Sequence, residues 1–178
     1  MPMTLSEQYQ KNIIPLLQKD FGYPNRMAVP RIEKVVINVG VGKRSPDEQK
    51  QIARDLSLIA GQKLMERRAR QSIASFKVRQ GQVIGFKTTL RGRKMYDFID
   101  RLISIALPRT RDFRGIDSRA IDPYGNLTIG IPEHIVFPEM VGEETKFIFG
   151  FEATCVTNAR TSEEARRLFD ALGFPFKK

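Results

Sequence analysis

Apolar and polar residues alternate in several short segments of the chain, and this period predicts strands. The clearest case is residues 31–39, RIEKVVINV, in which Val35, Ile37 and Val39 share one parity. Such alternation is typical of a strand that buries one of its faces. Four further strands are predicted, at residues 62–68 (a short edge strand), 83–91, 126–131 and 146–157.

Other segments repeat their apolar residues at the helical period. Spacings of the capping-box type, S/T-x-x-E, begin at Thr4, Ser45 and Thr161 and mark three helix starts. Pro15 predicts a kink in the first helix, and Pro108 is expected to end the third. The predicted helices span residues 4–20, 46–60 and 94–107, followed by a last one between Thr161 and Gly173.

The order of these elements predicts an α+β fold: a mainly antiparallel sheet with helices packed on one face and a long basic hairpin loop. The second face of the sheet would then be free to bind a partner. The loop is expected at residues 72–85, which carry Gly81 and Gly85. A length of 178 residues without repeats or a linker favours a single domain, residues 1–178.

Charge changes this picture because it is concentrated. The chain has 30 Lys and Arg against 20 Asp and Glu, a net charge of +10. Residues 63–94 alone hold 10 basic groups and 1 acidic group, whereas residues 120–178 are net negative. Concentrated positive charge favours a phosphate backbone as the partner. A membrane surface is less favoured, because Gly81 and Gly85 interrupt the amphipathic helix that it would require.

Composition also bounds the setting of the protein. A single Cys excludes an internal disulfide and a Cys-rich zinc site. The first residues, MPMTLSEQYQK, lack the apolar core of a signal peptide, and no apolar run reaches the length of a membrane span. We therefore expect a reduced cytoplasmic protein with no membrane partner.

The sequence contains few residues or motifs of the kinds that enzymes use for catalysis. The only His, His134, and the only Cys, Cys155, are better interpreted as structural residues. The segment 40–45, GVGKRS, suggests a phosphate-binding loop but departs from G-x-x-x-x-G-K-[ST] at Ile37 and Arg44. The acidic cluster at Glu139, Glu143 and Glu144 lacks partners for a metal site. We predict no catalytic residue, no metal and no cofactor.

Residues 72–92, SIASFKVRQGQVIGFKTTLRG, closely resemble part of the family of large ribosomal subunit protein five, in its bacterial form. The resemblance covers essentially the whole chain, because further segments match the family in the same order. These segments are residues 29–42, 59–63, 106–116, 124–139 and 172–178. It implies a structural constituent of the large ribosomal subunit that binds 5S rRNA and helps to attach it to 23S rRNA in the central protuberance.

The resemblance also assigns residues. It implicates Asn38, Gln62 and Thr89 in 5S rRNA binding, where amide and hydroxyl groups suit ribose and base edges. The residues alone favour a structural interpretation of each: Asn38 as a strand-end turn residue, Gln62 as a surface amide after the helix and Thr89 as a good strand former.

The loop 72–85 matches the family's extended loop that faces the peptidyl-site tRNA, although a solvated basic hairpin is the plainer interpretation. Its implicated residues are Phe76, Lys77, Arg79, Gln80 and Gly81. Supplementary phosphate contacts are expected from Lys63, Arg67, Arg68, Arg70, Arg91 and Arg93.

The remaining implied partners are other large-subunit proteins and a small-subunit protein at an inter-subunit bridge. Residues 109–119 and the acidic loop 139–144 resemble the regions that lie near the small-subunit protein and a 23S rRNA helix. Two segments depart from the family: the connection after Gly42 is shorter, and IDPYGN (121–126) lacks an Arg. A phosphate-ligand enzyme and a general nucleic-acid chaperone stay as alternative functions.

Overall fold

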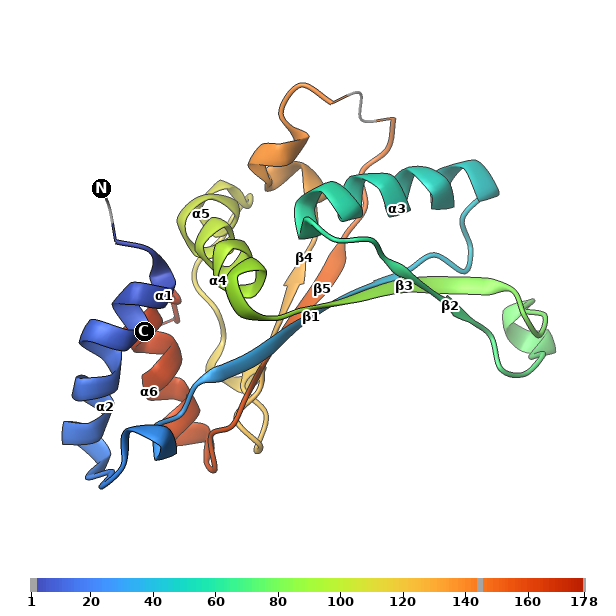
Figure 1. Ribbon diagram of the computed structural model, residues 1–178. Coiled ribbons are helices and arrows are strands. Elements are labelled where there is room, and N and C mark those ends of the chain that lie inside the picture. The colour runs from blue at the N-terminus through green and yellow to red at the C-terminus, as the bar shows by residue number, and fades with distance from the viewer. Residues whose placement is uncertain (1–2, 144–145, 178) are drawn as a thin grey trace.

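The computed structural model describes residues 3–143 and 146–177, which form one antiparallel five-stranded sheet with helices against one side (Figure 1). The strand order is β2-β3-β1-β5-β4. The strands are β1 (Ile32–Gly40), β2 (Met65–Arg68), β3 (Val83–Leu90), β4 (Leu127–Ile131) and β5 (Phe151–Thr157). The predicted α+β architecture is confirmed, and β2 lies at an edge of the sheet as expected.

The central strand β1 alternates as its sequence predicts. Val35, Ile37 and Val39 are buried, whereas Asn38 between them is exposed. Its neighbours keep the same parity, because Thr88 and Leu90 on β3 are buried while Thr89 is only half-buried. One face of the sheet therefore carries the core and the other is polar.

The helices supply the other half of the core. They are α1 (Leu5–Gln8), α2 (Ile14–Phe21), α3 (Pro46–Ala60), α4 (Gly92–Arg101), α5 (Leu107–Arg109) and α6 (Ser162–Leu172). Leu56 on α3, Phe98 on α4 and Phe169 on α6 are fully buried, so each helix presents an apolar stripe to the sheet or to its neighbours. No helix in the described part of the chain is long and apolar enough to cross a membrane.

Helix caps agree closely with the sequence. Thr4 and Ser45 each form the predicted capping box with the Glu three residues later. The third box is incomplete: Thr161 accepts a hydrogen bond from the Glu164 N–H, but the Glu164 carboxylate accepts one from the Arg160 N–H instead. Helices α2, α3 and α6 end at Gly22, Gly61 and Gly173, each in the left-handed conformation, as predicted.

Pro15 and Pro108 each follow a wide π-type turn, and the prediction that Pro108 ends its helix is wrong. The residue before Pro15, Ile14, donates its N–H to the Tyr9 carbonyl, and Leu107 before Pro108 donates to the Leu102 carbonyl. A proline ring clashes with the carbonyl four residues earlier in a regular helix, and a wider turn relieves this clash. The kink at Pro15 thus becomes a π turn, and the helical run passes through Pro108 to Arg109 instead of ending there.

Strand β5 begins at Phe151, not at residue 146 as the apolar pattern predicts. Phe149 exchanges hydrogen bonds with His134, its carbonyl accepting from the His134 N–H and its N–H donating to the imidazole Nδ1. Phe149 therefore pairs with the segment after β4, and residues 146–150 are not part of β5. Residues 144 and 145, which include the acidic Glu144, lie outside the described residues.

Residues 69–82 connect β2 to β3 at the end of the molecule farthest from α2 and α6 (Figure 1). Ile73 and Val78 pair with each other, and Lys77 turns the chain in a left-handed conformation with φ of 53°. The predicted loop boundary at residue 85 is too late, because Val83, Ile84 and Gly85 belong to β3.

Candidate nucleic-acid interface

The side of the sheet opposite the core carries polar side chains from all five strands; we call it the open face. The strand register places its members side by side: Lys87 and Glu152 flank Asn38, and Thr89 and Thr154 flank Val36. Its side chains are Lys34, Val36, Asn38, Met65, Arg67, Lys87, Thr89, Thr128, Glu152, Thr154 and Val156.

The three residues expected to bind RNA lie close together. Asn38 and Thr89 are on the open face, two positions apart in the register of β1 with β3. Gln62 follows α3, and its Nε2 donates to the Thr88 Oγ1 at 3.0 Å and to the Thr89 carbonyl at 3.3 Å. The Gln62 amide therefore also satisfies Thr88, which is buried on the core side.

The open face has an uneven charge. Lys87 pairs across the strands with Met65, and Arg67 pairs with Gly85, so both cations lie towards the β2 edge. Glu152 lies on the other side of β1. An anionic ligand that crosses the sheet would therefore meet Lys87 and Arg67 near β2 and β3 and Lys34 towards the start of β1. Sequence reasoning did not single out Lys87, although the period-2 alternation from Thr89 places it on the same face.

Of the six supplementary cations, Lys63, Arg67, Arg68 and Arg70 lie in or beside β2, whereas Arg91 and Arg93 follow β3, with Arg93 near α1. All six are exposed, and two of them have acidic neighbours: Arg68 is 3.0 Å from Glu66, and Arg93 is 3.7 Å from Asp97. Exposed pairs of this kind contribute little and exchange readily for a phosphate. Neighbouring Lys94 instead donates to the Gly61 carbonyl at the end of α3.

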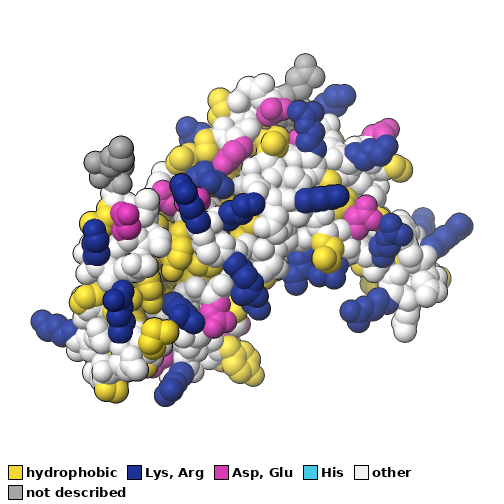
Figure 2. All heavy atoms as spheres, in the orientation of Figure 1, with side chains coloured by type: hydrophobic (Ala, Val, Ile, Leu, Met, Phe, Trp, Pro, Cys, Tyr) yellow, Lys and Arg dark blue, Asp and Glu magenta, His cyan; other side chains and the backbone are white. Residues whose placement is uncertain are grey.

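The 69–82 connection is organised by its own hydrogen bonds. The Gln80 N–H donates to the Ser72 hydroxyl at 2.9 Å, and the Arg79 N–H donates to the Gln82 side chain at 3.1 Å. Phe76 stays 68% exposed. Dark-blue Lys and Arg side chains gather on this projecting end (Figure 2). The connection thus presents an aromatic ring among cations, away from Asn38 and Gln62.

Comparison with known proteins decides the family. A family model described as "Ribosomal protein L5" matches residues 25–79, and one described as the "ribosomal L5P family C-terminus" matches residues 83–176. The chain belongs to the ribosomal protein L5 family.

Curated relatives named large ribosomal subunit protein uL5 span nearly the full length of both chains. That of Kosmotoga olearia is 47% identical over 176 residues, 98% of this chain and 96% of its own. That of Syntrophomonas wolfei is 49% identical over 175 residues, 97% of this chain and 98% of its own.

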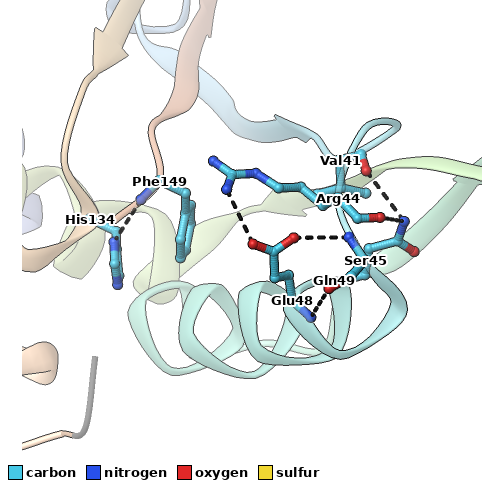
Figure 3. Close-up of polar contacts among 7 residues, drawn as sticks. All are labelled: Val41, Arg44, Ser45, Glu48, Gln49, His134 and Phe149. Carbon is cyan, nitrogen blue, oxygen red and sulfur yellow. Dashed lines mark hydrogen bonds and ion pairs between the residues drawn. The ribbon is translucent and has the colours of Figure 1, made fainter. Parts of the chain in front are cut away.

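Membership of the L5 family makes this chain a ribosomal protein and not an enzyme, as the sequence predicts. Its only His has a structural setting: His134 is fully buried, lies 3.8 Å from Asp55, and stacks on Phe149 with ring centroids 3.9 Å apart. Figure 3 shows His134 beside Phe149. Burial raises the pKa of the Cys155 thiol to about 12, which keeps it protonated and unreactive.

The other candidates for chemistry in this L5-family chain also have structural roles. Ser45 caps α3, and its N–H donates to the Glu48 carboxylate at 2.9 Å, so the 40–45 segment is a turn into a helix (Figure 3). Glu139 forms an ion pair with Arg101 at 2.6 Å, and Glu143 pairs with Arg54 at 3.0 Å. Among the described residues, no group of three His, Cys, Asp or Glu is arranged to hold a metal ion.

Proposed function

We propose that this chain is a structural constituent of the large ribosomal subunit that binds 5S rRNA through the open face. Its relatives carry the name large ribosomal subunit protein uL5, which supports the place in the subunit. The single observation that carries the RNA proposal is a polar sheet face on which Asn38, Lys87 and Thr89 adjoin. In this role the protein helps to attach 5S rRNA to 23S rRNA in the central protuberance.

The chemistry of the open face suits RNA better than DNA. A sheet surface is broad, and the minor groove of an A-form helix is wide and shallow and displays ribose 2′-hydroxyls. The Asn38 amide and the Thr89 hydroxyl can both donate to and accept from these groups. Lys87 and Arg67 supply phosphate contacts at the same edge. Gln62 acts mainly by fixing Thr88 and the backbone of Thr89.

The 69–82 connection is proposed to contact the peptidyl-site tRNA. Its projection from the sheet, its cations and its exposed Phe76 support contact with a second RNA away from the open face. A contact with a small-subunit protein at an inter-subunit bridge is proposed for residues 109–119. The 139–144 loop is a weaker candidate for an external contact, because Glu139 and Glu143 already pair within the chain.

A titration tests the proposal. Fluorescently labelled 5S rRNA and an unrelated structured RNA of equal length are titrated with the protein at several salt concentrations. We expect tighter binding of 5S rRNA at every salt concentration, with affinity falling steeply as salt rises because phosphate contacts release counterions. Equal affinities for both RNAs throughout would instead indicate a general nucleic-acid chaperone.

Matched variants then locate the interface. Asn38→Ala combined with Thr89→Val should weaken 5S rRNA binding by about tenfold, because buried ligand groups lose their partners. Asn12→Ala removes an exposed amide from the N-terminal helical segment and should bind as the wild type does. Unchanged binding by the double variant would show that the open face is not the interface.

A further inference from the structure

A pocket of about 720 Å³ lies between the turn after β1 and the 69–82 connection. None of the open-face side chains lines it. One wall comes from residues 40–44, and the other comes from the β2–β3 connection and the start of β3. The side chains that make it apolar are Val41, Ala69, Ile73, Phe76, Val78 and Ile84.

Both walls are held in place by backbone hydrogen bonds. The Val41 N–H donates to the Ile84 carbonyl at 2.8 Å, which fastens the turn to β3. The Ile73 and Val78 backbones pair with each other, and the left-handed Lys77 closes the bend between them. The pocket is therefore preformed, although Ile73 is 44% exposed and Phe76 is 68% exposed. Apolar side chains that gather at a pocket and stay exposed to solvent are typical of a binding site.

The rim of the pocket is cationic on both sides. Lys43 and Arg44 come from the turn after β1, and Arg70 comes from the opposite wall. No Asp or Glu is among the lining residues. Arg44 is steadied by Glu48, 3.5 Å away, and lies over the Phe147 ring (Figure 3 shows the contact with Glu48). In the described part of the chain, no ion pair is formed by Lys43 or Arg70.

Apolar walls together with a cationic rim on both sides favour an RNA nucleotide as the occupant. An unpaired nucleotide offers a flat apolar base for the slot and a phosphate on each side of it for the two cationic rims. A protein segment would have to place acidic groups on both sides of an apolar side chain to meet the same charges. The two-sided rim therefore favours RNA over protein.

We propose that this pocket accepts a single unpaired base of RNA, stacked against Phe76, with the flanking phosphates on Arg70 and on Lys43 and Arg44. The proposal rests on the proposed function as an RNA-binding protein but uses a second site. It assigns Phe76 and Arg70 to one nucleotide subsite, in place of general phosphate contact.

The probe is a single-stranded heptaribonucleotide of uridines with a central 2-aminopurine, whose fluorescence falls when the base stacks. We expect the wild-type protein to quench it on binding. Phe76→Ala should weaken binding about tenfold and abolish the quenching, since the base loses the aromatic ring on which it stacks. Tyr124→Ala is the matched control, because Tyr124 is a 78% exposed aromatic residue outside the pocket.

Two further variants separate the components of the site. Phe76→Leu keeps an apolar side chain without a ring and should still lose the quenching. Arg70→Gln should bind more weakly and with a shallower dependence on salt. Wild-type quenching by Phe76→Leu would overturn the stacking proposal.

The outcome is distinguishable from a failure of the proposed function. If Phe76→Ala binds the heptanucleotide as the wild type does while 5S rRNA is still bound selectively, only the pocket proposal fails. The same conclusion holds if the heptanucleotide does not bind at all, which would point to a protein as the occupant. Loss of preference for 5S rRNA by the wild type would instead overturn the open-face proposal.

Discussion

Gly85 shows, at the scale of single residues, how little space separates β3 from β1. A Cβ at this position would lie 2.8 Å from the Val39 carbonyl oxygen. A Cβ on its strand partner Gly40 would meet no atom within 4 Å. We expect Gly85→Ala to lower the free energy of unfolding by about 1–3 kcal/mol, because the backbone must move.

Gly40→Ala is the control for this substitution on the facing strand. It should leave stability unchanged or raise it slightly, because Ala loses less conformational freedom than Gly on folding. Urea unfolding of both variants measures the difference. Equal effects of the two substitutions would show that the close approach of Gly85 to Val39 does not limit the side chain there.

His134 makes a second prediction at this scale. Burial lowers the pKa of its imidazole below the ordinary value of 6.5, against the opposing effect of Asp55. The unfolded chain therefore binds the proton more readily, and stability should fall as the pH falls below about 6.5, by at most about 1.4 kcal/mol per pH unit. Burial raises the pKa of Asp55, whose effect has the opposite sign and acts at lower pH.

The measurement is direct because the chain contains one His. The ring signals of His134 in an NMR titration should have a midpoint below 6.5, and unfolding experiments at pH 7.5 and 5.5 should show the loss of stability. His134→Phe should flatten this dependence. A midpoint above 6.5 would mean that the attraction of Asp55 outweighs burial.

At the scale of elements, two serines act on α3 in opposite ways, Ser45 as its N-cap and Ser57 within it. Ser45 accepts a hydrogen bond from the Glu48 N–H at the start of the helix, whereas Ser57 donates to the Ala53 carbonyl within it. Ser45→Ala should cost about 1 kcal/mol, because an N-cap is lost. Ser57→Ala should be neutral or stabilising, since that side chain competes with the helix backbone. Thermal unfolding checks both, and equal losses would contradict the assignment.

Elements were predictable where their signals are local. The boxes at Thr4 and Ser45 involve residues three positions apart, so the sequence contains the whole interaction. The start of β5 was not predictable from its apolar pattern, because Phe149 pairs with His134, 15 residues away. Likewise the helix continues past Pro108 because Leu107 is buried in the core and a π turn accommodates the ring.

In the candidate site, too, the features set by local sequence signals were predictable and those set by long-range contacts were not. Period-2 alternation within β1 and β3 is a local signal, and it is consistent with the register, which places Asn38 and Thr89 on one face. The sequence could not predict that Gln62 reaches Thr88, because 26 residues separate them. Nor could it predict the pocket beside Phe76, which depends on the turn after β1 meeting the β2–β3 connection.

At the scale of the whole molecule, we propose that the chain folds as one unit although two family models divide it. Strand β1 lies in the first matched segment but pairs with β3 and β5 of the second. A fragment of residues 83–178 lacks this central strand and should not fold. Circular dichroism should show no cooperative thermal transition for the fragment and a single one for the full chain. A cooperative transition in the fragment would show two independent domains.

The central claim is that 5S rRNA covers the open face, and the most direct test is hydroxyl-radical footprinting of the full chain with and without 5S rRNA. Met65 lies on the open face and is 60% exposed, whereas Met27 is 71% exposed and precedes β1. Both react with the radical in the free protein. We predict that 5S rRNA slows the oxidation of Met65 and leaves that of Met27 unchanged. Protection of Met27 without protection of Met65 would contradict the account.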